Sequence, residues 1–270
     1  MALKLQEAGF EVVAWNRTLA KLAPLREAGI ETTEVASGAI TSCDITITIL
    51  SDAAAIESAL FVNSEALAGR TILQMATIAP EESRELKRRV EAAGGTYLEA
   101  PVLGSIPEVQ TGALIVMVGS TPEQFEQWMS IFKCFGDEPQ LMGQVGTASA
   151  TKLAMNQLIG TLTSAFSMSL GLVNREGLDL EKFMTLVRTS ALYAPQFDKK
   201  LERMCDRNFE DPNFPTKHLL KDMNLFVRAA ENKYVDATVA ASVSQLVQKA
   251  ISQGLADKDY SALYSAVNPN

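Results

Sequence analysis

The sequence is poor in the residues that build metal sites, disulfide frameworks and nucleic-acid interfaces. Its 270 residues include three cysteines, scattered without a C-x-x-C pair, and a single histidine, His218. This inventory disfavours a zinc site and a disulfide scaffold, and it fits the reducing cytoplasm. The formal net charge of −8 repels nucleic acid and anionic lipid rather than attracting them. We therefore expect a cytoplasmic protein with no metal centre and no nucleic-acid partner.

Charge is absent from the long segment between Lys152 and Arg175, whose length is close to that of a membrane span. Polar residues such as Gln157, Ser164 and Ser167 interrupt the segment. These groups are poorly placed in lipid but can be satisfied between packed helices. We expect a long buried helix, covered on most sides by protein, and no membrane partner. Its apolar surface exceeds what one small domain covers, which favours a homodimer or homotetramer.

The sequence also lacks a G-x-G-x-x-G turn. A doubly wound domain normally opens with a strand, this turn, and a helix whose N-terminus faces a pyrophosphate. Residues 1–9 here resemble the end of such a helix, with Gly9 at its C-cap, and a strand follows directly. We expect either a domain without its first strand and phosphate loop, or a coding start upstream of Met1.

Strand-like and helix-like segments alternate through the first half of the chain. This alternation is typical of βαβ units on a parallel sheet. After about Gln144 the signals are helical, with breaks at glycine and proline. The sequence predicts a Rossmann-type α/β domain without its first strand at 1–146, an all-α domain at 147–270, and a long interdomain helix joining them. The expected strands are 11–15, 44–50, 71–75, 96–102 and 114–118.

A turn with the sequence Asn16-Arg17-Thr18 follows the strand at 11–15. NAD-binding domains usually place an acidic residue here to hold the ribose 2′-hydroxyl, whereas a cation beside a hydroxyl suits a 2′-phosphate. The turn therefore favours NADP over NAD. The alternative is a solvated turn in which Thr18 caps the next helix.

Lys152 and Asn156 lie four residues apart, which places them on one face of the long helix. A lysine in the early turns of a helix meets the positive end of the macrodipole, an arrangement that stability alone would not select. Burial and the dipole both lower a lysine pKa towards values useful for proton transfer. The alternative is a lysine that reaches solvent at a helix end, with Asn156 bonded to a neighbouring loop.

Small residues and polar side chains follow several of the expected strands. The segment Leu103-Gly104-Ser105 forms a turn whose backbone N–H groups could bind a carboxylate, or a tight turn chosen for its geometry alone. Leu50-Ser51 and Thr77 stand at carboxyl ends of parallel strands, where open α/β sheets bind ligands.

The second domain carries a polar helix start after Phe214 and Pro215. His218 lies next to basic Lys217 and is interpreted as a surface or packing residue. Lys221 and Asp222 are adjacent, so we expect them to point in different directions and to serve different ligands.

Taken in order, these segments resemble the β-hydroxyacid dehydrogenase family, in its branch of 3-hydroxyisobutyrate dehydrogenase-like glyoxylate and succinic semialdehyde reductases. The resemblance covers nearly the whole chain. Each motif alone is weak, and the ordered set is specific. The matching segments are WNRT at 15–18, QMATIAPEES at 74–83, EAPVLGS at 99–105, GQVGTASATKLAMN at 143–156 and FPTKHLLKDMNL at 214–225.

The resemblance implies an NADPH-dependent reductase of a small aldehyde acid, with glyoxylate or succinic semialdehyde as the type of substrate. It implies that Lys152 is the general acid and base and that Asn156 orients it. The implied cofactor-binding residues are Asn16, Arg17, Thr18, Leu50, Ser51, Thr77 and Lys221. The implied substrate-binding residues are Leu103, Gly104, Ser105, Phe214 and Asp222.

The sequence departs from the family pattern in two places. Leu103 stands where the family usually has a serine, which removes a hydroxyl donor from the substrate motif. The phosphate loop is missing, so cofactor affinity should fall. A catalytically impaired cofactor-binding or structural homologue is therefore the alternative. Imine reduction on the same scaffold commonly replaces the lysine with an acid or a tyrosine, so Lys152 argues against it.

Overall fold

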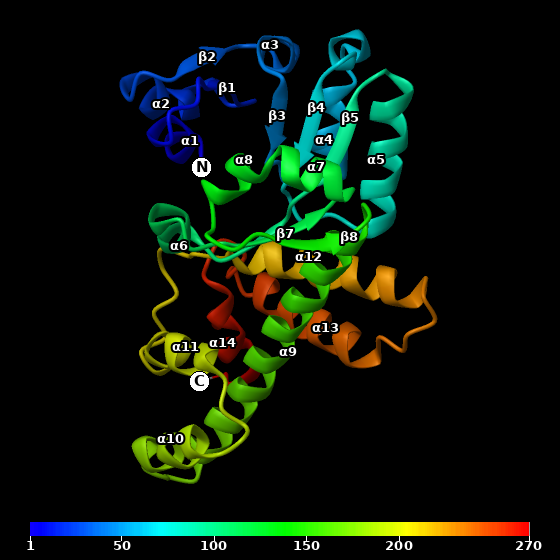
Figure 1. Cartoon of the computed structure of the whole chain (residues 1–270). Coiled ribbons are helices and arrows are strands. Elements are labelled where there is room, and N and C mark those ends of the chain that lie inside the picture. The colour runs from blue at the N-terminus through cyan, green and yellow to red at the C-terminus, as the bar shows by residue number, and fades with distance from the viewer. Residues whose placement is uncertain (270) are drawn as a thin grey trace. The chain divides into compact units, whose positions relative to one another are not determined.

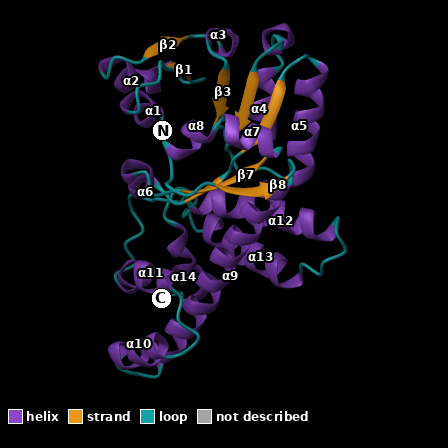
Figure 2. Cartoon of the chain, viewed as in Figure 1, coloured by secondary structure: helices purple, strands orange, loops and turns teal. Residues whose placement is uncertain are grey.

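The computed structural model describes residues 1–269, which divide into two compact units. The first unit is Met1–Lys152 and the second begins at Leu153. Figure 1 shows strands with flanking helices in the first unit, and Figure 2 shows the second unit as helices and loops. The predicted fold class, an α/β domain followed by an all-helical domain, is confirmed.

The first unit alternates strands and helices. Its strands are β1 (Val13–Trp15), β2 (Glu31–Thr33), β3 (Ile45–Thr48), β4 (Thr71–Gln74), β5 (Thr96–Glu99), β6 (Val102–Leu103), β7 (Ile115–Gly119) and β8 (Gln140–Gly143). Its helices are α1 (Ala2–Glu7), α2 (Ala23–Glu27), α3 (Ala36–Ser42), α4 (Ala53–Leu60), α5 (Pro80–Ala92), α6 (Ile106–Thr111), α7 (Pro122–Gln127) and α8 (Met129–Lys133), with 3-10 turns η1 (Leu19–Leu22) and η2 (Ser64–Leu67).

The main sheet is mixed rather than wholly parallel. Strands β3, β4 and β5 are parallel, whereas β7 runs antiparallel to both β5 and β6 and parallel to β8. The strand expected at 96–102 is divided between β5 and β6 at Ala100-Pro101. Proline has no N–H to donate to a ladder, which explains the interruption.

Strands β1 and β2 form a separate parallel pair (Figure 1). Within residues 1–269, no strand joins β1 to β3 by ladder hydrogen bonds. A continuous doubly wound sheet would have one strand between these two. The interruption lies where the sequence predicts the missing first strand.

Helix α5 illustrates how the first unit builds its core. Pro80 occupies the first helical turn, where its missing N–H costs nothing, and Glu82 accepts a 2.8 Å hydrogen bond from Ala79 N. Ser83, Leu86 and Val90 recur at helical spacing and are fully buried. They face the sheet, where the leucine and valine join a cluster containing residues of β4 and β5.

Helix α9 (Thr147–Arg175) is the long uncharged helix expected from the sequence. Its hydroxyls are satisfied largely within the helix, because Thr163, Ser164 and Ser167 each donate to the carbonyl four residues earlier. Coverage by protein is less complete than expected. An apolar stripe remains exposed at Met155, Leu158, Met168 and Leu172.

As far as residue 269, the regular elements of the second unit are all helical. They are α10 (Leu180–Thr189), α11 (Pro195–Cys205), α12 (Thr216–Glu231), α13 (Thr238–Ser252) and α14 (Leu263–Val267), with a 3-10 turn η3 (Tyr260–Ala262). Leu219 and Met223 of α12 pack in one core with Val243 of α13. Gly160 lets α9 approach this core, since a Cβ there would lie 2.8 Å from Met223 Sδ. In the described part of the chain, no helix is long and apolar enough to cross a membrane.

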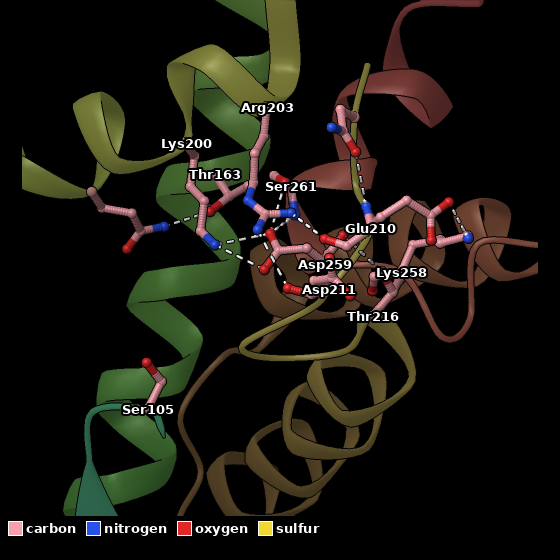
Figure 3. A network of polar contacts seen from close by, with 12 residues as sticks. Ser105, Thr163, Lys200, Arg203, Glu210, Asp211, Thr216, Lys258, Asp259 and Ser261 are labelled. Atoms are coloured by element: carbon pink, nitrogen blue, oxygen red, sulfur yellow. Dashed lines mark hydrogen bonds and ion pairs between the residues drawn. The ribbon is translucent and has the colours of Figure 1, made fainter. Parts of the chain in front are cut away.

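A polar network connects α11, the start of α12 and the turn before η3 (Figure 3). Lys200 Nζ lies 2.9 Å from both carboxylate oxygens of Asp259, which also accepts bonds from the N–H and the hydroxyl of Ser261. The Thr216 hydroxyl donates to the carbonyl of Lys258 at 2.9 Å. These contacts tie the start of α12 to the turn before η3.

Candidate functional site

Lys152 lies in the second turn of α9 and is 8% exposed. Water is therefore largely withdrawn from the ammonium group, although Lys152 keeps an interaction with its surroundings. A lysine needs a specific role to remain at such a position, because an isolated buried cation is costly. A role of Lys152 in proton transfer stays a prediction.

The helix turn before Lys152 is anchored by Glu99 at the end of β5. Glu99 is fully buried, and its Oε1 accepts hydrogen bonds from the N–H groups of Gly146 and Ser149 at 2.7 and 3.0 Å. Its Oε2 accepts from the hydroxyls of Ser149, at 2.5 Å, and Ser83. The carboxylate therefore satisfies donors at the start of α9 that have no partner within the helix.

Asn156 is 2% exposed and donates a 2.6 Å hydrogen bond through Nδ2 to Asp222 Oδ2. Lys221 Nζ lies 3.1 Å from Asp222 Oδ1, so these neighbours on α12 form an ion pair. That contact is not aligned as a hydrogen bond, and Asp222 Oδ1 accepts none in the described residues. The Lys221 side chain is 28% exposed and that of Asp222 is 3% exposed, so the two adjacent positions face different surroundings, although the long lysine stem reaches the carboxylate. That they serve different ligands stays a prediction.

Leu50 and Ser51 follow β3, and Thr77 follows β4. Because β3 and β4 are parallel neighbours, the structure brings these strand ends to the same edge of the sheet. The Ser51 hydroxyl donates to Asp52 at 2.8 Å, and Asp52 caps α4 by accepting from Ala55 N. Leu50 and Thr77 are half-buried. Small hydroxyl side chains at the carboxyl ends of parallel strands are typical of ligand-binding edges in this class of sheet.

Leu103 lies in β6, opposite Ile115 of β7, and the next two residues make the turn into α6. Gly104 has φ of +131°, and a Cβ there would lie 2.6 Å from a methyl of Leu114, so only glycine fits. Both the N–H and the hydroxyl of Ser105 donate to Glu108 Oε2 at 2.8 Å. Ser105 thus already binds a carboxylate, which belongs to its own helix.

The Asn16-Arg17-Thr18 turn follows β1 as expected. Asn16 Oδ1 accepts a 2.8 Å hydrogen bond from Thr18 N, which stabilises the turn locally. Thr18 occupies the N-cap position of η1 without a side-chain cap bond. Arg17 and Thr18 are exposed. The cation and the hydroxyl are therefore accessible to an anionic group from solvent.

Phe214 and His218 lie at the start of α12 and have packing contacts. The Phe214 ring meets Tyr260 edge-on, with 5.7 Å between centroids. Burial lowers the pKa of His218, and the nearby ammonium groups of Lys221 and Lys217 lower it further. Within residues 1–269, no cluster of histidine, cysteine or acidic residues could hold a metal ion.

Glu99, Ser149 and Glu108 are site-proximal residues to which sequence reasoning assigned no individual role. Glu99 is the one charged residue in the buried apolar segment 97–100, and this is the signal that could have drawn attention to it. Its partners near the start of α9 lie 47 and 50 residues away, so no local pattern predicts these contacts. Glu108 follows Ser105 by three residues, the spacing of a helix-capping box.

Comparison with known proteins places this geometry in a family. A family model described as the NAD binding domain of 6-phosphogluconate dehydrogenase matches residues 1–146. A second, described as "NAD-binding of NADP-dependent 3-hydroxyisobutyrate dehydrogenase", matches residues 146–267.

Individual relatives agree over almost the whole chain. Glyoxylate/succinic semialdehyde reductase 1 of Arabidopsis thaliana is 33% identical over 99% of this chain and 93% of its own length. The cytokine-like nuclear factor N-PAC of Aedes aegypti is 27% identical over 98% of this chain but only 48% of its own length. The Mycobacterium tuberculosis 3-hydroxyisobutyrate dehydrogenase structure with L-serine superposes with a TM-score of 0.90 at 19% identity, covering 98% of this chain and 94% of that one. The chain belongs to the β-hydroxyacid dehydrogenase family of oxidoreductases and carries that family's pyridine-nucleotide-binding domain.

Proposed function

We propose that this chain catalyses the NADPH-dependent reduction of a small aldehyde acid, of the glyoxylate or succinic semialdehyde type, to the corresponding hydroxyacid. The observation that carries the proposal is the buried lysine at position 152, one helical turn before the buried amide of Asn156. The name of the Arabidopsis relative supports the substrate class. The description of the second family match supports NADP.

In the proposed reaction Lys152 supplies a proton, and NADPH, when bound, would supply the hydride for the aldehyde carbon. The Lys152 ammonium donates a proton to the carbonyl oxygen as charge develops there, which leaves the lysine neutral until it regains a proton from water. In the oxidative direction, the neutral amine removes the hydroxyl proton. Asn156, fixed by Asp222, orients the reacting groups along the face of α9.

The described residues fit the adenosine end of NADP. The exposed guanidinium of Arg17 and the hydroxyl of Thr18 follow β1, which is where a ribose 2′-phosphate is bound in this fold. Leu50, Ser51 and Thr77 would line the cofactor at the strand ends, and Lys221 would contact it from α12. For the substrate we propose contacts from Leu103, Gly104, Ser105, Phe214 and Asp222.

Turnover assays with a matched pair of lysine variants test the proposal. Purified protein with NADPH and glyoxylate or succinic semialdehyde should lose nicotinamide absorbance. Lys152→Ala should lower kcat by at least about 100-fold and leave NADPH affinity unchanged, because general acid catalysis contributes that much. Lys249→Ala, at an exposed position on α13, should retain wild-type turnover. Full activity in Lys152→Ala would refute the proposed role.

The second candidate is a non-catalytic nucleotide-binding protein. Its support is the Ser105 turn, where the hydroxyl and the N–H that a substrate carboxylate would need already donate to Glu108. Titration of the protein with NADPH and NADH by isothermal calorimetry separates the two functions. Binding without turnover of any small semialdehyde would favour the second candidate, whereas turnover with a preference for NADPH would favour the first.

We also propose that a second copy of the chain covers the exposed stripe of α9, giving a homodimer or homotetramer. Leu158, Met168 and Leu172 are 50%, 52% and 63% exposed, which is unusual for large apolar residues aligned on one helix. Sedimentation should show an oligomer that Leu172→Glu dissociates. A monomeric wild-type protein would remove this proposal. A cytoplasmic location remains a prediction, consistent with the three free cysteines.

A further inference from the structure

A buried carboxylate lies at the N-terminus of the helix that carries Lys152. Glu99 is fully buried at the end of β5, and its two oxygens accept four hydrogen bonds from three residues. Three of these bonds come from Gly146, which directly precedes α9, and from Ser149 in its first turn. A side chain from a distant strand thus caps the helix.

The Glu99 carboxylate fits in the sheet only because the residue opposite it has no side chain. Gly119 pairs with Glu99 across β5 and β7. A Cβ at Gly119 would lie 2.5 Å from Glu99 Oε1. Gly119 has no positive φ, so its backbone does not require glycine. Its small size instead preserves the position from which Glu99 reaches the helix.

Lys152 follows Ser149 by three residues, so the capped turn and the lysine are about 4.5 Å apart along the helix axis. The N-terminus of a helix carries a partial positive charge that disfavours an ammonium group. A carboxylate at the same end opposes this charge. Because the surroundings are buried, solvent screens the interaction only weakly.

We propose that Glu99 is a positioning residue for the reductase reaction, which fixes the first turn of α9 and keeps the Lys152 ammonium protonated for proton donation. The inference rests on the proposed function of Lys152. The Glu99 carboxylate has two separable effects. Its hydrogen bonds fix the position of Lys152, and its negative charge sets the pH range in which Lys152 stays protonated.

Two substitutions separate these effects. Glu99→Gln keeps the size of the side chain and removes its charge, whereas Glu99→Asp keeps the charge and shortens the reach to the amides. Ser83→Ala is the matched control. It removes one hydrogen bond from the same carboxylate, and the bond between the Ser83 and Tyr97 hydroxyls, but leaves both the charge and the contacts with α9. All three proteins are first compared with the wild type by circular dichroism and urea unfolding.

The pH profile of kcat/KM for aldehyde reduction is the first readout. If Lys152 is the proton donor, turnover should fall at alkaline pH as that proton is lost. Glu99→Gln should move this alkaline limb to lower pH by about one unit, the effect of removing one nearby charge in a buried site. Ser83→Ala should leave the limb in place. Glu99→Asp should lower kcat while moving the limb by less than about 0.3 unit.

Competitive labelling of Lys152 with acetic anhydride across the same pH range is the second readout, and it needs no turnover. Peptide mass spectrometry should show the Lys152 labelling midpoint shifted by the same amount in Glu99→Gln. Folded Glu99→Gln protein with an unshifted midpoint would overturn the inference, as would an equal shift in Glu99→Asp. If the wild type reduces no aldehyde, the proposed function fails, and the labelling still decides whether Glu99 controls Lys152.

Discussion

Asn156 Nδ2 donates a 2.6 Å hydrogen bond to Asp222 Oδ2, and the two side chains are 2% and 3% exposed. This contact links α9 to α12 within the second unit. A neutral amide beside a buried carboxylate provides a donor without adding a second charge, so the identity of each partner matters.

Substitution of Asn156 by aspartate should destabilise the second unit at neutral pH. Two carboxylates would then face each other at hydrogen-bond distance in a buried site, and they could share it only by retaining a proton. We expect a loss of about 2–3 kcal/mol in the free energy of unfolding, measured by urea denaturation at pH 7.5. The loss should shrink as the pH falls and one carboxyl becomes protonated.

The exchanged pair Asn156→Asp/Asp222→Asn is the control for that prediction. It restores one amide and one carboxylate at the same contact, so more than half of the lost stability should return. A double variant no more stable than Asn156→Asp would contradict the charge explanation.

The buried ion pair between Lys200 and Asp259 gives a second prediction (Figure 3). Lys200→Met removes the cation but leaves Asp259 buried, with Ser261 as its remaining side-chain donor. We expect a loss of about 3 kcal/mol in the free energy of unfolding. Lys199→Met, at the exposed neighbouring position, should change stability by less than about 0.5 kcal/mol.

The companion variant Lys200→Met/Asp259→Leu tests whether the unpaired charge is the cause. Removal of both charges should recover part of the stability, because the desolvated carboxylate is gone. If Asp259→Leu lowers the free energy of unfolding by the same amount in the wild type and in Lys200→Met, the two side chains are not coupled.

The protein's single histidine offers a direct test of local electrostatics. Burial, with Lys221 and Lys217, lowers the pKa of His218 below its ordinary value of 6.5. Asp222 and Asp257 act in the opposite direction with smaller effect. A proton NMR titration should therefore show one histidine signal that titrates below pH 6.5.

The lowered pKa of His218 has a defined consequence for stability. The unfolded chain takes up a proton at higher pH than the folded chain, so the stabilising contribution is complete above pH 6.5 and is lost as pH falls through the folded value. His218→Gln should flatten the acid limb of the stability profile. Lys217→Met should raise the pKa of His218, and Lys249→Met should leave it unchanged. A signal that titrates above pH 6.5 would contradict this account.

Local patterns predicted the elements whose signals are short-range. Strands β3 and β4 and the long helix α9 are predictable from the sequence, because strand and helix periodicity reflect burial on one or both faces. Strands β2 and β8 escaped prediction. Glu31 is exposed in β2, and Leu141 and Met142 remain exposed in β8, so neither strand shows a buried face.

The candidate site was predictable as a set of positions but not as a set of contacts. Lys152 and Asn156 share a helix face, which spacing alone indicates. Asp222 lies 66 residues from Asn156, and the bond between them arises from helix packing. The spacing of Ser105 and Glu108 is that of a helix-capping box, so this contact could have been predicted. The sequence motif instead suggested that the Ser105 turn binds a substrate carboxylate.

Gly119→Ala should reproduce, by steric means, the loss of the Glu99 contacts with α9. The added Cβ would lie 2.5 Å from Glu99 Oε1 and would displace the carboxylate from the N–H groups of Gly146 and Ser149. Two helix donors would then lose their partners in a buried site, so we expect a loss of about 2–4 kcal/mol in the free energy of unfolding. Hydrogen exchange should show faster exchange of the Ser149 amide.

Glu99→Ala provides the comparison for Gly119→Ala, because it removes the carboxylate with which the new methyl group would clash. Adding Gly119→Ala to Glu99→Ala should cost less than about 1 kcal/mol, well below the cost of Gly119→Ala alone. Equal costs in the two backgrounds would mean that Gly119 is required by something other than Glu99.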